Sequence, residues 1–360
     1  MLRHCQQSYR IIQKSRNRLI TSSIQISIDK ELSSIRKMSS SIKSPFPKWP
    51  NPVHDAEGDY RTEAAFLETK LHTAKNNLYM HQKSIPRLPL PSISDTLSKL
   101  APTVLPLVKH NENEKTSFLQ AIEDFPSQVA QLHLQERLEK RRNKDYSNSS
   151  WLQHWWNTLG YLDVRDPVVI NVSYFYHFQT DPTLPTTQHE DLSIPRTAAI
   201  LTKLAKLRQE ICGATLPPPS VGRKTPVYLC NTQYKYAFHT CRIPKLNRDV
   251  YRMYDPSLAE HSHCLIIHRG QYYAMDFVDP ETGEPLPLKL LEQRLKKIKQ
   301  MEAQENKISL GWLTSWNRDS WAKGRNSLLA VGGTDMEQAL AKLESAAFAI
   351  CLDDEVSFAF

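Results

Sequence analysis

Apolar residues recur at every third or fourth position in three stretches of the first 150 residues. That spacing places them on one face of a helix, so it predicts helices over 62–81, 94–109 and 115–142. Pro102 and Pro106 are expected to interrupt the second helix, because proline has no N–H to donate. The segment 85–91 carries three prolines in seven residues and is predicted to be an extended strap, neither helix nor central strand.

The pattern changes after residue 150, where β-branched and aromatic runs predict strands. One run follows Pro167, at 168–172. Two more, 263–268 and 271–278, flank Arg269-Gly270, and a two-residue turn with glycine favours a hairpin. Further helices are predicted over 194–211 (capped by Gly213), 228–239, 288–304 and 336–346. Helices mixed with strands indicate an α/β layered fold, with a mixed sheet and flanking helices.

The net charge of +8 is concentrated at the front of the chain. Residues 1–43 hold nine Lys or Arg against Asp29 and Glu31, a net of +7, which leaves +1 for all the other residues. Apolar side chains such as Ile11 and Leu19 lie between these charges. A segment that is rich in Arg and Ser, poor in acids and interspersed with apolar residues is typical of a mitochondrial presequence.

Two alternatives stay open for this leader. One is a solvated basic tail, and the other is an RNA-binding arm, which is disfavoured because Tyr9 is the leader's one aromatic residue. Met38 offers a second start that would give a peroxisomal or cytosolic form, although the C-terminus at Phe360 carries no peroxisomal address. Residues 44–60 hold four prolines and a glycine and are predicted to be a linker.

The composition narrows the classes of protein that fit. With 40% hydrophobic residues, the 360-residue chain can bury a sizeable core. No run approaches the roughly 18 to 20 apolar residues of a membrane-spanning helix. Because the charge is nearly balanced outside the leader, no nucleic-acid partner is expected. The six cysteines show no CxxC pair and are expected to be reduced thiols.

One group of histidines can be considered as a metal site. His261, His263 and His268 lie close to Cys264, but no second pair of ligands follows at a usable spacing. Packed or surface histidines are therefore favoured, and no metal site is predicted.

Three tryptophans, Trp151, Trp155 and Trp156, lie within six residues. The simpler interpretation is a helix face that packs on the core. Tryptophans beside a cleft also form boxes around quaternary ammonium groups, and this alternative stays open.

Several segments, taken in order, carry a resemblance to a known family. They are Ile85-Pro86-Arg87-Leu88-Pro89-Leu90-Pro91 with Ser94-Asp95-Thr96-Leu97; Trp155-Trp156, Tyr161-Leu162 and Arg165-x-Pro167-Val168-Val169; Thr240-Cys241-Arg242-Ile243-Pro244; the hairpin turn Arg269-Gly270; Asp319-x-Trp321-Ala322; and Cys351-Leu352-Asp353-Asp354. Over residues 60–354 the chain resembles the choline/carnitine acyltransferases, most of all their carnitine acetyltransferase branch. Leu90 departs from the family pattern, which usually has a smaller or β-branched residue there.

This resemblance implies a CoA-dependent acyltransferase fold in two layers. The implied reaction moves an acyl group between coenzyme A, as co-substrate, and the hydroxyl of carnitine or choline. By the same resemblance, Trp156 and Tyr161 correspond to residues that line the carnitine side of the tunnel, and they are the candidate substrate-binding residues. No bound cofactor is implied, and a peripheral contact with a membrane is left open.

The resemblance also implies a general base that this sequence does not supply. In the family a histidine in a His-x-x-x-(Asp/Glu)-Gly type pattern takes the proton of the attacking hydroxyl or thiol. None of the thirteen histidines fits, and His54 is the nearest miss because Glu57-Gly58 comes one position too early. In relatives the motif follows the segment corresponding to 351–354 by some tens of residues. We therefore expect no catalytic residue in this chain.

The leading hypothesis is an acyltransferase that lacks its C-terminal half and is inactive alone. The alternative is a non-catalytic interaction module derived from the same family. Acyl-chain length and the choice between carnitine and choline are not determined by these residues. The predicted divisions are a leader (1–43), a linker (44–60), a helical segment that packs on the absent half (61–145), an incomplete N-terminal α/β domain (146–354) and a tail outside the family (355–360).

Overall fold

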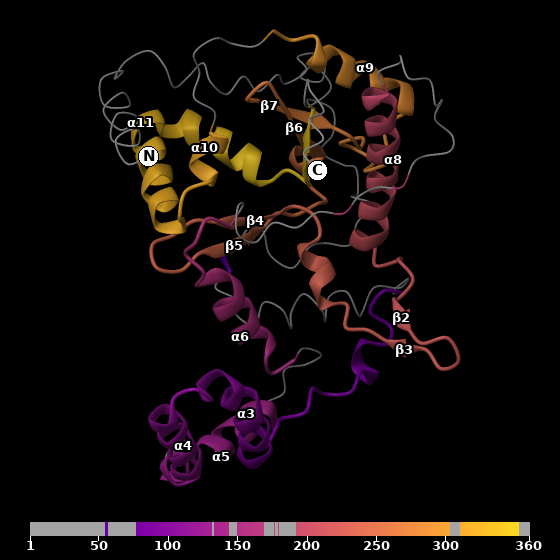
Figure 1. Cartoon of the computed structure of the whole chain (residues 1–360). Helices are drawn as coiled ribbons and strands as arrows, with labels where there is room; N and C mark the ends of the chain where they lie inside the picture. The colour runs from indigo at the N-terminus through magenta and orange to yellow at the C-terminus, as the bar shows by residue number, and fades with distance from the viewer. Residues whose placement is uncertain are drawn as a thin grey trace.

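The computed structural model describes residues 55–56, 77–131, 133–143, 150–168, 192–302 and 310–352, together with Tyr176 and Gln179. The predicted leader, most of the predicted helix over 62–81 and most of the predicted strand over 168–172 lie outside these residues. Figure 1 shows a body of mixed helix and sheet and a smaller helical lobe, joined by extended chain and by helix α6 (Gln153–Asn157).

A three-stranded mixed sheet lies at the centre of the body, in the order β7-β6-β8. Strands β6 (His263–His268) and β7 (Gln271–Asp276) form the predicted antiparallel hairpin. Arg269 (φ 47°) and Gly270 (φ 73°) both have positive φ, as a type I′ turn requires. Strand β8 (Ala349–Cys351) pairs parallel to β6, so the prediction of a mixed sheet is confirmed.

Two helices supply most of the core that packs with this sheet. Helix α8 (Ser193–Cys212) and helix α9 (Leu288–Lys299) lie together at one side of the body (Figure 1). Their buried residues form one cluster with the strands: Ile194, Ala198, Leu201 and Ala205 of α8, Leu291, Leu295 and Ile298 of α9, Cys264 and Ile266 of β6, and Tyr273 and Met275 of β7. Each fully buried Leu or Ile stabilises the fold by about 1.5–3 kcal/mol, so this cluster is the principal core.

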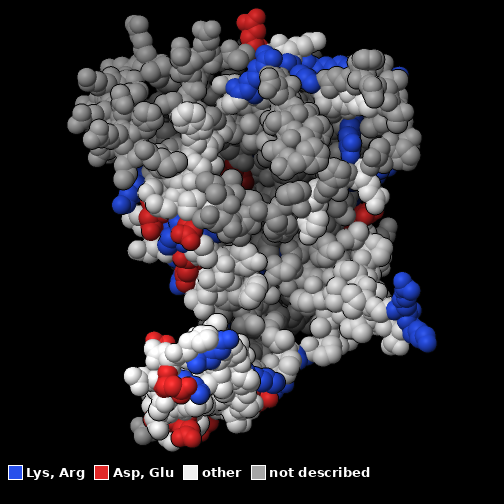
Figure 2. Space-filling model, viewed as in Figure 1, with Lys and Arg blue, Asp and Glu red and all other residues white. Residues whose placement is uncertain are grey.

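The outer face of α9 is basic. Figure 2 shows Lys and Arg gathered over this helix at one end of the body. The helix carries Lys289, Arg294, Lys296, Lys297 and Lys299 against Glu292. Its apolar residues recur every three or four positions and face the core, which is why the predicted helix forms, although it ends at Lys299 and not at 304.

A second sheet and a long helix occupy the other side of the body. Strands β4 (Thr240–Ile243), β5 (Val250–Met253) and β1 (Asp55–Ala56) pair antiparallel in the order β1-β5-β4. Helix α10 (Gly311–Thr314) leads into α11 (Arg318–Glu344), and Figure 1 places both across the body from α8.

Helix α11 begins earlier than predicted. The sequence pattern indicated a helix over 336–346, but the Asn317 side chain caps a start at Arg318 by accepting a hydrogen bond from the backbone N–H of Ser320. Gly333, with φ 53° and ψ −142°, bends the chain within this span. The predicted helix is therefore the second half of a longer, kinked one, and glycine allows the bend because it has no Cβ.

The helical lobe consists of α3 (Ile93–Val108), α4 (Glu112–Gln131) and α5 (Leu134–Asn143). Pro102 and Pro106 do not interrupt α3, contrary to the prediction. No residue of α3 is buried, so a carbonyl left without its N–H donor is accessible to water. The helix predicted over 115–142 is two helices, α4 and α5, separated at His133 (φ 48°). The strap over 85–91 has no helix or strand, as predicted.

The prediction of a helix over 228–239 is wrong. Strands β2 (Ser220–Val221) and β3 (Val227–Tyr228) pair there, and a 3-10 turn, η5 (Thr232–Tyr236), follows. Tertiary contacts explain the difference, because the Asn231 side chain donates to the carbonyl oxygen of Leu78 at 2.6 Å. Two further 3-10 turns among the described residues are η3 (Gln82–Ser84) and η6 (Ala259–His261).

Helix α8 ends at Gly213 as predicted, but its C-cap geometry is different from the one expected. Gly213 keeps helical angles (φ −77°), and Ala214 takes the positive φ of 56°. The Ala214 carbonyl accepts hydrogen bonds from the backbone N–H groups of Asn77 and Leu78. These bonds to a distant segment hold Ala214 in a conformation that L side chains rarely adopt.

Candidate functional site

Two of the three tryptophans anchor helix α6 to the rest of the chain. Trp151 is 9% exposed and donates its Nε1–H to the carbonyl oxygen of Leu88 in the strap at 3.2 Å. The guanidinium of Arg141 lies 4.1 Å from the ring centroid of Trp155. The simpler interpretation was a helix face packed on the core. Trp151 is packed, but it lies just before α6, which begins at Gln153, and the Trp155 ring faces the guanidinium of Arg141.

The third tryptophan, Trp156, belongs to an exposed aromatic pair. It is 58% exposed, and it meets Tyr161, which is 48% exposed, edge to face with ring centroids 6.3 Å apart. The two candidate residues thus lie together. Large aromatic rings usually avoid this degree of exposure, so the pair is a candidate contact surface.

A π-helical turn explains why residues five apart meet. The turn η4 (Thr158–Leu162) follows α6, and the Asp163 N–H donates to the carbonyl oxygen of Thr158 at 2.8 Å, five residues back. In an α-helix, side chains three or four apart are neighbours, whereas the wider turn here brings Trp156 and Tyr161 together. Such turns often occur at functional sites.

A buried ion cluster lies directly after this turn. The carboxylate of Asp249 is 0% exposed. It forms ion pairs with Arg242 Nε at 2.6 Å, Arg318 Nε at 2.6 Å and Arg165 Nη2 at 3.1 Å. Asp319 also pairs with Arg165, at 3.1 Å.

Sequence reasoning missed Asp249. Arg165, Arg242 and Asp319 all belong to segments that carry the family resemblance, but nothing in the spacing of these segments predicts that they meet. One signal was available, since Asp249 is the acidic residue nearest in sequence to Arg242.

The buried histidines have structural partners. His239 Nε2 accepts a hydrogen bond from Arg208 Nε at 2.7 Å, and its Nδ1 lies 3.0 Å from the carbonyl oxygen of Ser345. His268 Nδ1 and His261 Nδ1 face the carbonyl oxygens of Leu352 and Asp255. The packed alternative for the histidine cluster is therefore confirmed for His261 and His268.

Burial lowers the basicity of these imidazoles. Desolvation, with the charge of Arg208 as a second cause, lowers the pKa of His239 well below its usual value. Desolvation and the charge of Lys342 lower the pKa of His263 to about 4. A general base must reach its substrate, and the rings of His239 and His263 are each 1% exposed.

The described part of the chain shows neither a metal centre nor a membrane span. Among residues with a described placement, no three His, Cys, Asp or Glu side chains are grouped to hold a metal ion. None of the described helices is long and apolar enough to cross a bilayer.

The sequence of the chain matches the family model described as choline/carnitine O-acyltransferase over residues 88–359. This match covers most of the chain. The chain belongs to the choline/carnitine acyltransferase family. The matched range includes the strap from Leu88 onward, the aromatic pair, the Asp249 cluster and every described strand apart from β1, so membership agrees with the α/β fold.

Individual relatives in this family place the chain near carnitine enzymes. It is 30% identical over 276 residues to carnitine O-acetyltransferase of Columba livia, a match that covers 76% of this chain and 42% of the relative. It is 29% identical over 287 residues to the Homo sapiens enzyme of that name, covering 79% and 43%. Against the mitochondrial carnitine O-palmitoyltransferase 2 of Bos taurus it is 28% identical over 304 residues, covering 76% and 43%. The chain thus spans less than half the length of these relatives.

Proposed function

We propose that this chain supplies the carnitine-facing wall of an enzyme that transfers acetyl groups between coenzyme A and carnitine. The exposed Trp156–Tyr161 pair is the observation that carries the proposal. Carnitine carries a quaternary ammonium group, and such cations bind over the faces of aromatic rings. Similarity to carnitine O-acetyltransferases supports acetyl as the acyl group.

Turnover in this proposal needs residues beyond those of the 360-residue chain. Attack on a thioester requires a base to take the proton of the carnitine hydroxyl. No histidine of the chain lies in the family's pattern, and the buried histidines of the body are bonded to carbonyl groups or to Arg208. The C-terminal part that the relatives possess is proposed to supply this base and the groups that hold coenzyme A.

An acetyl-transfer assay tests the proposal directly. Purified 360-residue chain is mixed with acetyl-CoA and carnitine, and the free thiol of coenzyme A is followed with a chromogenic disulfide. The expected rate equals the background rate without protein. A clear rate above background would refute the need for further residues.

The role of the aromatic pair is tested in the extended enzyme, by which we mean this chain together with the C-terminal part that the proposal requires. A cation–π contact in a desolvated site contributes about 2 kcal/mol, so Trp156→Ala should raise the KM for carnitine roughly 30-fold and leave the KM for acetyl-CoA nearly unchanged. Trp312→Ala is the matched control, because Trp312 is also exposed, at 66%, but belongs to α10. Equal effects of both substitutions would contradict the assignment.

The helical lobe supports a second candidate, a non-catalytic docking module. None of the residues described in α3 and α5 is buried, and Leu100, Leu107, Leu119 and Phe125 are between 38% and 80% exposed. Figure 2 shows that the lobe mixes acidic and basic side chains with uncharged surface. A purified chain that is stable and soluble favours this candidate, whereas the lack of CoA-dependent activity is expected of both. Leu107→Asp should then abolish capture of its partner while leaving the fold intact.

A mitochondrial location is part of the proposal. The composition of residues 1–43 and the name of the Bos taurus relative support it. Fusing residues 1–43 to a fluorescent reporter should direct the reporter to mitochondria, whereas changing Arg10, Arg16 and Arg18 to Glu should leave it in the cytosol.

A peripheral contact with an anionic membrane would use the basic face of α9. Co-sedimentation of the chain with anionic vesicles tests this contact.

A further inference from the structure

We propose that Asp249 is the positioning residue of the Trp156–Tyr161 pair. The consequence for carnitine binding rests on the proposed function. The claim that Asp249 fixes the position of the pair rests on the contacts alone. Asp249 lies on the chain between β4 and β5, more than eighty residues beyond the pair in sequence. It acts on the pair through the arginines that surround it and through its own backbone.

The side chain of Asp249 is fully buried and accepts several hydrogen bonds. Its Oδ2 accepts from Arg242 Nε and Arg318 Nε, both at 2.6 Å, and its Oδ1 accepts from Arg165 Nη2 at 3.1 Å and from the backbone N–H of Lys245 at 3.2 Å. Four donors from three segments therefore converge on one carboxylate. Hydrogen bonds between ionised groups are roughly twice as strong as neutral ones.

The same groups hold the backbone directly after the π-helical turn. The Asp249 N–H donates to the carbonyl oxygen of Leu162 at 3.0 Å, and Arg242 Nη2 donates to that of Val164 at 2.9 Å. The Arg318 N–H donates to the carbonyl oxygen of Arg165 at 2.8 Å. Three of the four carbonyls over 162–165 are thus tied to the cluster, which fixes the end of the turn that carries Tyr161.

The middle of the turn is exposed, and the turn is buried at its two ends, at Thr158 and at Leu162. Leu159, Gly160 and Tyr161 are exposed, and a Cβ at Gly160 would meet no atom within 4 Å. Leu162 at the end of the turn is 4% exposed and packs on Tyr251 and Met253 of β5. The end of the turn next to Tyr161 is therefore held by the segment 162–165, which the arginine cluster fixes.

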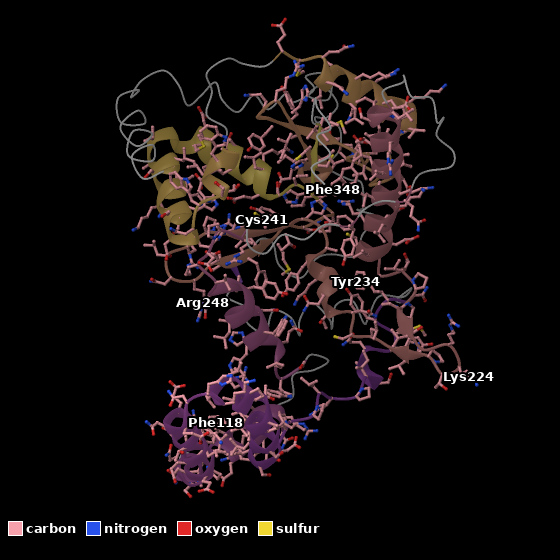
Figure 3. All side chains as sticks on the ribbon, in the orientation of Figure 1. Phe118, Lys224, Tyr234, Cys241, Arg248 and Phe348 are labelled. Atoms are coloured by element: carbon pink, nitrogen blue, oxygen red, sulfur yellow. The ribbon has the colours of Figure 1, made fainter. Side chains whose placement is uncertain are left out.

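An outer ion pair supports the same end of the turn. Arg248, labelled in Figure 3 close to α6, pairs with the carboxylate of Asp163, which lies directly after the turn. This pair is half exposed and contributes less than the buried contacts. The buried carboxylate is thus the stronger determinant.

The negative charge of Asp249 keeps the surrounding arginines in place. Three guanidinium groups share this region with two carboxylates, and Asp319 reaches only Arg165. Without the Asp249 charge, Arg242 and Arg318 would be neighbouring cations with side chains only 22% and 7% exposed. They would move apart toward water, and the donors to Val164 and Arg165 would move with them.

Fluorine NMR of the 360-residue chain labelled with 5-fluorotryptophan tests this inference. The resonance of Trp156 is assigned by its absence in Trp156→Phe. In Asp249→Asn, which keeps the size and removes the charge, this resonance should shift or broaden, because the ring leaves its edge-to-face contact with Tyr161. If Asp249→Asn does not fold, Arg242→Lys is used. Lysine keeps the charge but offers one nitrogen in place of the two that bond Asp249 and Val164, so it should move the same resonance.

Glu344→Gln is the matched control. Glu344 is the carboxylate of a second buried cluster, with Arg325 Nε at 2.9 Å and Arg325 Nη2 at 2.6 Å, and it lies outside the contacts that hold 162–165. The control should lower the melting temperature and leave the Trp156 resonance in place. An unmoved Trp156 resonance in the folded Asp249 or Arg242 variant, or an equal movement in Glu344→Gln, would overturn the inference. A displaced resonance without any effect on carnitine KM in the extended enzyme would instead refute only the proposed function.

Discussion

Acid should destabilise the body of this protein through His239, and the size of the effect can be worked out. The ring is 1% exposed, and its Nε2 accepts the Nε–H of Arg208 at 2.7 Å. An accepting nitrogen carries no proton, so the folded chain holds this imidazole neutral next to a guanidinium. Desolvation and Arg208 together lower its folded pKa well below the usual value.

The sign of the effect depends on proton uptake in the two states. In the unfolded chain the imidazole has its ordinary pKa of about 6.5 and binds a proton as the pH falls, while the folded chain does not. Stability is therefore complete above the unfolded pKa and decreases below it. Between pH 7.5 and pH 5, protonation of the unfolded form alone costs about 2 kcal/mol.

The test compares the pH dependence of unfolding in two proteins. His239→Asn is chosen because His239 has a positive φ of 54°, which Asn tolerates better than most residues. Urea midpoints at pH 7.5 and pH 5 give the loss of stability for each, and the variant should lose about 2 kcal/mol less than the parent. Parallel pH curves for the parent and His239→Asn would refute the argument from burial.

The core, the hairpin turn and the thiols give three further predictions. Leu201→Ala removes a side chain that is 0% exposed and should cost about 2–5 kcal/mol by urea unfolding, whereas Leu207→Ala, at 37% exposure on the same helix, should cost under about 1 kcal/mol. Gly270→Ala should cost about 1–2 kcal/mol because the residue has φ 73°, and a loss near zero would show that the turn adapts. Under native conditions a thiol reagent should modify exposed Cys230 at once and spare Cys264, whose pKa is raised by burial, and equal rates would contradict the packing.

Local patterns predicted those elements whose stabilising contacts are close in sequence. The hairpin of β6 and β7 was predictable because Arg269-Gly270 adopts the two positive φ angles that the turn demands. Helix α8 was predictable because its buried residues recur at three and four, and its end was marked by Gly213. The strap was predictable because three prolines exclude both regular structures.

Elements whose conformation depends on distant contacts were mispredicted. Residues 228–239 have a helical pattern, but Asn231 is held by Leu78 and Gln82, about 150 positions earlier. The continuity of α3 across Pro102 depends on exposure to water, which the sequence does not record. For the candidate site, the sequence resemblance named Trp156 and Tyr161, yet the π-helical turn that brings them together could not be foreseen, because it depends on how residues 162–165 are held.

The sequence by itself thus determined the family and the α/β class and singled out Trp156 and Tyr161 as candidates, because motifs and periodicities are local properties of the chain. Only the tertiary structure decided that Arg165, Arg242 and Arg318 share the single buried carboxylate of Asp249. The physical reason is that these side chains come within about 3 Å of one another only after folding has brought their distant segments together, and that the cost of burying the charges is offset because each one is paired.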